Sequence, residues 1–238
     1  MSELALFKGG LPAYLQTAQD DVTNALAGES LGARRISIKG GVFREMIGGK
    51  EYRVSEERSM NVVIVKAAPK VSRVFYSGTY SEGETVSPTC WSSDSQRPDE
   101  KVKEKQSATC LTCPQNIKGS GQGDSRACRY SQRLAVSLAN DIGGEVMQLT
   151  LPASSIFGAG ESGKWPLQTY AKMIGGKGVP ITAVVTEMRF DTNSATPKIT
   201  FKPVRVLDAE EHEIVIRQGQ SDAATRAITM TVAEADGV

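Results

Sequence analysis

All four cysteines of this 238-residue chain lie in one polar stretch in the middle of the sequence. Cys90 and Cys128 stand alone, whereas Cys110 and Cys113 are separated by a Leu-Thr dipeptide. Two thiols at this spacing can turn toward one ion in a tight turn, and the two flanking cysteines would complete a tetrahedral shell of sulfur ligands. The spacing therefore predicts a structural Zn²⁺ site formed by Cys90, Cys110, Cys113 and Cys128.

Two other uses of the cysteines remain open. Disulfides need an oxidising compartment, and the polar start MSELALFKGG contains no apolar secretion signal, which favours an intracellular protein. A redox-active Cys-x-x-Cys pair usually begins a helix, whereas Pro114 and several glycines follow this pair and favour a loop. The only histidine, His212, lies far along the chain in a charged run, so we expect it on a solvated helix and expect no catalytic zinc.

The apolar pattern divides the chain into an arm, a strand-rich domain, an insertion and a tail. The insertion is polar and contains every cysteine, and it would be disordered without a metal to replace a hydrophobic core. Its place between strand-rich segments favours one domain. We expect an N-terminal arm and short helix at 1–33, an OB-like β domain at 34–80 and 132–207, a zinc-binding insertion at 81–131, and a C-terminal helix and tail at 208–238.

Alternation of apolar and polar residues predicts the strands, and glycine or proline at their ends predicts the turns. Hairpins are expected where Gly48 and Gly49 separate two strands and across Thr192-Asn193. Pro166 and Gly175 are expected at the two ends of a helix. We expect strands over 34–39, 42–47, 51–54, 61–67, 71–80, 133–139, 145–152, 180–191 and 197–207, and C-terminal helices over 208–216 and 222–232.

This order of elements predicts a mainly β (α+β) protein. It matches an OB-like five-stranded Greek-key barrel with a helix between its third and fourth strands, a zinc-binding insertion and a C-terminal helix. The strands around 132–151 would then be additions to the barrel. An all-β sandwich is the alternative.

The segment GAGESGK at 158–164 matches part of a phosphate-binding loop and resembles that of heterotrimeric G-protein α subunits. Trp165 follows it where a Ser or Thr hydroxyl would hold Mg²⁺, and the alternating strand and helix pattern of nucleotide-binding domains is absent. A single histidine and the absence of a Gly-x-Ser-x-Gly elbow exclude the common nucleophile–histidine arrangements. We therefore expect a flexible loop around Lys164 and a protein that is not an enzyme.

Charge and aromatic residues favour a nucleic-acid ligand. Residues 34–73 hold ten basic and four acidic residues, whereas residues 208–238 hold two basic and seven acidic ones. Single strands are bound by cations along the phosphates and by rings on which bases stack. Alternation predicts that Arg73 and Phe75 share an exposed strand face, while Val74 and Tyr76 pack inward. The predicted nucleic-acid contacts are Lys39, Arg44, Tyr52, Arg53, Lys66, Arg73, Phe75, Tyr80, Trp91, Lys118, Arg129, Tyr130 and Arg133.

Two segments, 88–136 (from PTCWSS to RLAV) and 199–215 (ITFKPVRVLDAEEHEIV), resemble bacteriophage single-stranded DNA-binding proteins that carry a zinc subdomain inserted in an OB-fold. The resemblance implies cooperative, sequence-tolerant coating of single strands in viral replication or recombination. It also implies replication or recombination proteins as partners and self-association along the DNA.

No apolar run is long enough to span a membrane, so we expect a soluble protein of the host cytoplasm. A different class of function is a zinc-containing protein-interaction module of a phage or mobile-element complex, without direct DNA binding. A third is a degenerate nucleotide binder that depends on Lys164.

Overall fold

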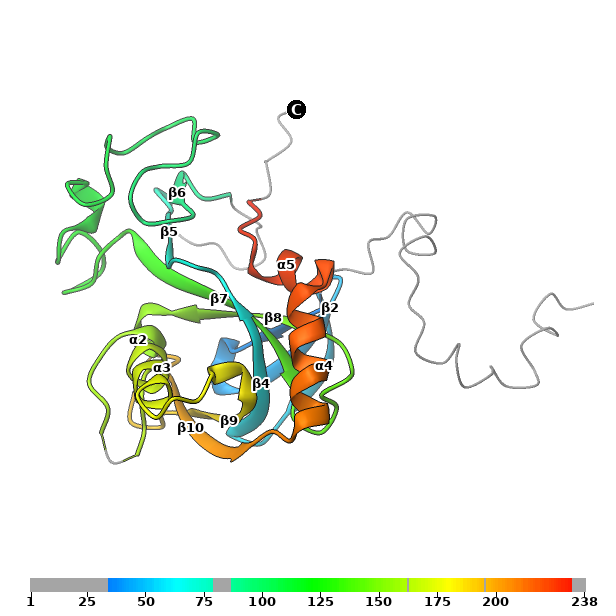
Figure 1. The fold of residues 1–238 in the computed structure, drawn as a ribbon. Helices are drawn as coiled ribbons and strands as arrows, with labels where there is room; N and C mark the ends of the chain where they lie inside the picture. The colour runs from blue at the N-terminus through cyan, green and yellow to red at the C-terminus, as the bar shows by residue number, and fades with distance from the viewer. Residues whose placement is uncertain (1–33, 79–86, 162, 195, 233–238) are drawn as a thin grey trace, which may run out of the picture. The chain divides into compact units, whose positions relative to one another are not determined.

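The computed structural model describes residues 34–78, 87–161, 163–194 and 196–232. The predicted arm and helix at 1–33, the predicted contact Tyr80 and the final residues 233–238 lie outside these ranges. The described chain is mainly β, with a curled mixed sheet and a few helices (Figure 1). The strands are β1 (Arg35–Ser37), β2 (Phe43–Ile47), β3 (Lys50–Ser55), β4 (Ser59–Ala67), β5 (Ser72–Phe75), β6 (Cys90–Ser92), β7 (Arg129–Leu138), β8 (Met147–Pro152), β9 (Val184–Phe190) and β10 (Ile199–Val206).

The sheet runs in the order β10-β9-β4-β7-β8-β1-β2-β3, and β5 joins it through β7 while also pairing with β6. All strand pairs are antiparallel except β1 and β8, where Ile36 lies opposite Leu149 in a parallel register. The expectation that the strands around 132–151 are additions is wrong. Strand β7 is central, because it pairs with β4, β5 and β8.

Both predicted hairpins form. Gly48 and Gly49 connect β2 to β3 with φ values of 57° and 82°, in the left-handed region that glycine adopts without steric cost. The β9–β10 hairpin turns at Asp191 to Ser194. The long strand expected at 71–80 is shorter, because β5 ends at Phe75.

Helices cover both faces of the sheet. They are α2 (Ala153–Ile156), α3 (Leu167–Gly175), α4 (Ala209–Gln220) and α5 (Asp222–Ile228), with short 3₁₀ turns η3 (Lys39–Gly41), η4 (Pro114–Asn116) and η5 (Ile181–Ala183). Strand β4 is buried on both sides, since Val62 and Ile64 belong to one apolar core while Val63 and Val65 belong to another. Helix α3 contributes Tyr170 to the first core, and α4 contributes Val215 to the second.

The C-terminal helices have well-defined starts. Asp208 caps α4 by accepting a hydrogen bond from the Glu211 backbone, and the Glu211 carboxylate accepts one from the Asp208 backbone in return. Arg205 at the end of β10 donates two hydrogen bonds of 2.6 Å to the same carboxylate and lowers the Glu211 pKa to about 2. Helix α4 is longer than predicted, and α5 is shorter.

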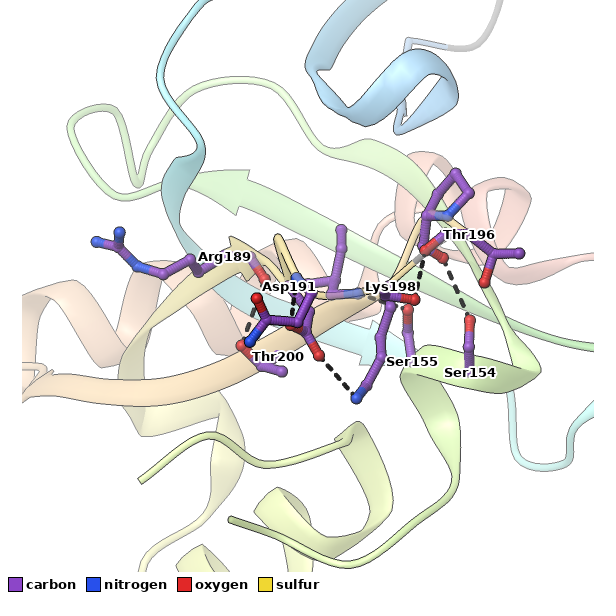
Figure 2. A network of polar contacts seen from close by, with 11 residues as sticks. Ser154, Ser155, Arg189, Asp191, Thr196, Lys198 and Thr200 are labelled. Carbon is purple, nitrogen blue, oxygen red and sulfur yellow. Dashed lines mark hydrogen bonds and ion pairs between the residues drawn. The ribbon is translucent and has the colours of Figure 1, made fainter. Parts of the chain in front are cut away.

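A polar network ties the β9–β10 hairpin to helix α2 (Figure 2). The Lys198 ammonium donates to Asp191 Oδ2 at 2.8 Å, and the Asn193 backbone donates to the other oxygen of that carboxylate at 3.1 Å. These contacts lower the pKa of Asp191. The Ser155 hydroxyl accepts from the Ile199 backbone at 2.8 Å, and Ser154 donates to a backbone carbonyl of the hairpin, so α2 is fixed to β10.

The loop before α3 is held by backbone hydrogen bonds within itself and to β10. The backbones of Glu161 and Lys164 hydrogen-bond to each other, and Trp165 pairs with Phe201 of β10.

Within the described part of the chain, no helix is long and apolar enough to cross a membrane.

Candidate functional site

The insertion is attached to the sheet through a short three-stranded unit formed by β6, β5 and the first half of β7. In this unit Arg73 of β5 lies opposite Ser92 of β6 and Tyr130 of β7, and Phe75 lies opposite Cys90. Residues directly opposite each other on antiparallel strands point to the same side. These five residues therefore share one face, which we call the cysteine face.

All four cysteines line one cavity of about 10 Å³ beside the cysteine face, together with Arg73. Each cysteine is free and buried, with 7–8% of its surface exposed. A cavity of this volume holds about one water molecule or one ion, which is too small for an organic ligand. The four predicted metal ligands therefore border the same small cavity.

Backbone hydrogen bonds hold the cysteines around this cavity. The Cys110 backbone donates to the Gln96 carbonyl at 2.8 Å, and the Cys128 backbone donates to the Gln115 carbonyl at 2.8 Å. The turn after Cys113 continues into η4, and the side chain of Asn116 donates to the Cys110 carbonyl at 3.0 Å. Segments far apart in the sequence therefore meet at the thiols.

The insertion has little hydrophobic core of its own. Its buried apolar cluster consists of Phe75, Cys90, Val102 and Cys128, with Trp91 and Ala127 packed beside it. Burial raises the pKa of Cys110 and raises that of Cys128 to about 11, although the positive charge of Arg73 acts in the opposite direction. The Cys110 and Cys128 thiols would therefore have to lose protons on binding a metal.

The thiol chemistry of these residues suits a zinc ion, but their side chains are not arranged as ligands. Among the described residues, no three Cys, His, Asp or Glu side chains are grouped closely enough to hold a metal ion as they stand. The thiols would have to turn into the cavity that they line. Two nitrogens of Arg73, Nε and Nη1, are buried without a hydrogen-bond partner, so this cavity has unmet donors for negative charge.

The opposite side of the three-stranded unit, which we call the outer face, carries cations and aromatic rings. Val74 lies between Trp91 on β6 and Arg129 on β7, and the three form a cross-strand row. Alternation places Tyr76, which is 47% exposed, on the same side just beyond the end of β5. Arg133 follows on β7, donates to the Ser72 hydroxyl at 2.8 Å and interacts electrostatically with Tyr76.

The predicted orientation of β5 is wrong. Arg73 is 3% exposed and Phe75 is 8% exposed, so they face the cysteines and are not accessible to a nucleic acid. Val74 and Tyr76 lie on the outer face instead. Alternation correctly separates Arg73 and Phe75 from Val74 and Tyr76, but it does not say which of these two pairs is buried. In the structure the cysteines cover Arg73 and Phe75.

The remaining predicted contacts are spread over the molecule. In the β2–β3 hairpin, Arg44 forms an ion pair with Glu51, Arg53 lies opposite Glu45, and Tyr52 is 68% exposed. Strand β3 is at the edge of the sheet and is separated from β7 by β8, β1 and β2. The structure therefore does not place this hairpin in the β5–β6–β7 unit.

Three other predicted cations also lie elsewhere. Lys39 is in η3 near the hairpin, Lys66 donates to Thr225 of α5 at 3.0 Å, and Lys118 forms an exposed ion pair of 3.1 Å with Asp124. Trp91, Arg129 and Arg133 are the predicted contacts on the strand positions of the outer face, and Trp91 is half-buried there because it also packs against the apolar cluster of the insertion.

Sequence reasoning missed two aromatic residues at this site. Tyr76 could have been found from the alternation of β5 had the buried side been known. Phe157, which is 36% exposed, packs edge-on against Tyr130 with ring centres 5.2 Å apart, and no local pattern indicates this contact.

Comparisons of the chain with protein-family models, with curated proteins and with solved structures find no match.

Proposed function

We propose that this protein binds single-stranded DNA without sequence preference through the outer face, and that a structural zinc ion held by the four cysteines braces this face. The observation that carries the proposal is the cross-strand row of Trp91, Val74 and Arg129, with Tyr76 and Arg133 beside it. Arginines can contact phosphates while the rings accept stacked bases, and every base offers a ring face, so such a surface is sequence-tolerant.

The proposed zinc ion has a structural role. Four sulfur ligands leave no open coordination position for a substrate or a reactive water. The small apolar cluster around Cys90 and Cys128 supports this role, because coordination supplies the folding free energy that limited hydrophobic burial does not. Since Cys90 is adjacent to Trp91 and Cys128 to Arg129, zinc binding would fix two of the three side chains of the cross-strand row.

In this proposal the curled sheet is an OB-like barrel whose insertion carries the DNA-binding face. The biological role is that of a phage single-stranded DNA-binding protein, which coats and protects strands during replication or recombination in the host cytoplasm. Replication or recombination proteins and neighbouring copies on the same strand are the expected partners.

The test is binding of a fluorescent oligo-dT to zinc-loaded protein over a series of salt concentrations. We expect the logarithm of the affinity to fall linearly with that of the salt concentration, with a slope of about −0.7 for each phosphate neutralised. Charge reversal of Arg129 should weaken binding and reduce the slope, whereas reversal of Arg53 on β3 serves as a matched control with little effect. No binding at roughly 100 mM salt by zinc-loaded protein would refute DNA binding.

One observation favours the alternative of a protein-interaction module. Leu111, between the paired cysteines, is 84% exposed, and Ile117, just after η4, is 63% exposed. Exposed apolar side chains on a metal-braced loop are suited to docking a protein partner. If Leu111→Ser with Ile117→Ser abolishes partner binding while charge reversal of Arg129 leaves DNA affinity unchanged, the alternative replaces the first proposal.

A further inference from the structure

Arg73 is a buried cation without a matching anion in the described residues. It is 3% exposed, and its Nη2 donates to the Tyr130 hydroxyl. Its Nε and Nη1 atoms are buried without a partner in hydrogen-bonding geometry, although the guanidinium is close enough to the Cys128 thiol to oppose the rise of its pKa. A buried charge that lacks partners is strongly unfavourable, so a group that accepts these hydrogen bonds is expected to bind here.

The cavity beside Arg73 is lined mainly by sulfur, hydroxyl and amide groups. The residues that line it include the four cysteines, serines, a threonine and glutamines, but no carboxylate. Asp94, which follows β6, is engaged elsewhere: its Oδ1 accepts from the Ser92 hydroxyl at 3.0 Å and from the Gln96 backbone at 2.8 Å. The cysteine sulfurs are therefore the groups at this cavity that can become anionic and strong acceptors.

We infer that Arg73 is the counter-charge of the zinc centre, and that its Nε–H and Nη1–H groups donate to cysteine thiolates once the ion is bound. This inference rests on the proposed zinc site. Four thiolates carry more negative charge than a divalent ion supplies in positive charge, so the loaded centre is a buried anion. A buried guanidinium beside it compensates that charge, and its hydrogen bonds orient the ligands.

Arg73 also connects the metal centre to β7. The guanidinium carbon lies 3.9 Å from the centre of the Tyr130 ring, and Tyr130 is adjacent to Arg129 of the outer face. Arg73 is thus a positioning residue between the ion and the DNA-binding strand. A lysine could supply the charge, but it could not reproduce the planar set of donors.

The test compares wild-type protein with Arg73→Met by zinc competition against a chromophoric chelator. We expect about a 10- to 100-fold loss of zinc affinity, the range typical for partners of metal ligands. In Co²⁺-loaded protein, the sulfur-to-cobalt charge-transfer band should shift, because hydrogen bonds to the thiolates are lost. Arg129→Met is the matched control: on the outer face of the neighbouring strand, it should leave zinc affinity unchanged while weakening DNA binding.

Thermal melting with and without zinc separates this role from a general structural one. Arg73→Met should lower the melting temperature of the zinc-loaded protein but not that of the metal-free protein, where the substitution removes an uncompensated buried charge. Equal destabilisation of both forms, or unchanged zinc affinity, would overturn the inference and leave the zinc site standing. A wild-type protein that binds no zinc would instead overturn the site itself.

If Arg73→Met does not fold, Arg73→Lys provides the test. It retains the cation with fewer aligned donors, so we expect a zinc affinity below that of the wild type and a shifted cobalt band. Wild-type values for both would contradict the inference.

Discussion

The guanidinium of Arg73 packs over the ring of Tyr130, its partner on the neighbouring strand, with 3.9 Å between the guanidinium carbon and the ring centre. This contact lies on the cysteine face, whereas Arg129, the residue next to Tyr130, is exposed on the outer face. Adjacent residues of β7 therefore have different environments. Tyr130 is available to stabilise the insertion, and Arg129 is available to a ligand.

Replacing Trp91 with alanine should weaken binding of oligo-dT. Stacking of a base on an aromatic ring contributes about 1–3 kcal/mol, so the dissociation constant should rise by roughly 5- to 150-fold. Fluorescence anisotropy at fixed salt measures the change. Tyr52→Ala, on the edge strand β3, is the comparison: a larger loss for Tyr52 than for Trp91 would place the interface on the β2–β3 hairpin instead.

Cys113→Ser should abolish tight zinc binding, because serine is a poor ligand for zinc and three sulfurs then remain. Metal analysis of protein purified under reducing conditions should find about one zinc per wild-type chain and substantially less in the variant. Chelation of the wild type should reproduce the thermal destabilisation of the variant. Wild-type protein that carries intramolecular disulfides and no metal would contradict this prediction.

Tyr170→Phe should destabilise the folded protein by about 1–2 kcal/mol, because the buried Tyr170 hydroxyl and Thr186 Oγ1 share a hydrogen bond of 2.7 Å. The loss leaves the threonine hydroxyl without its stronger partner inside the main core. Urea denaturation measures the free energy of unfolding. Tyr52→Phe removes a hydroxyl from an exposed ring and should have almost no effect, so equal losses in the two variants would argue against the burial of this pair.

Acidification should remove a stabilising contribution of Glu211. Arg205 lowers the pKa of Glu211 from 4.5 to about 2, so the folded protein binds this proton more weakly than the unfolded chain. The contribution is therefore complete above pH of about 4.5 and disappears as the pH falls toward about 2.

Glu211→Gln isolates this effect, because glutamine can keep the hydrogen bond to the Asp208 backbone but loses the charge opposite Arg205. The difference in unfolding free energy between wild type and variant should shrink over this pH range. Glu210→Gln removes a charge from the same helical turn and is the control. A difference that stays constant with pH would contradict the assigned cause.

Local patterns predicted most of the secondary structure. The alternation around Val62 to Val65, the glycines at 48 and 49 and the turn near Asn193 each determine a strand or hairpin from neighbouring residues. The spacing of Cys110 and Cys113 is a local signal for a metal site, and the structure places all four cysteines around one cavity, but the sequence does not indicate how their side chains are oriented.

Long-range pairing could not be read from the sequence. Nothing near β7 indicates that it pairs with β4, β5 and β8 at once, and the parallel contact of β1 with β8 depends on segments separated by the whole insertion. The buried side of β5 was likewise inaccessible, because it depends on which face the insertion covers. For the same reason Arg73 was predicted to bind a ligand, although it is buried.

The parallel pairing of Ile36 with Leu149 has a consequence for how the chain reaches its folded state. Strand β1 is synthesised early, but it acquires this neighbour only after the insertion and β8 have emerged from the ribosome. Closing so long a loop slows folding, as it does in proteins dominated by contacts between distant residues. During this interval the edge of β1 that later meets β8 remains unpaired, and its length of only three residues limits how much backbone is open to pairing with another chain.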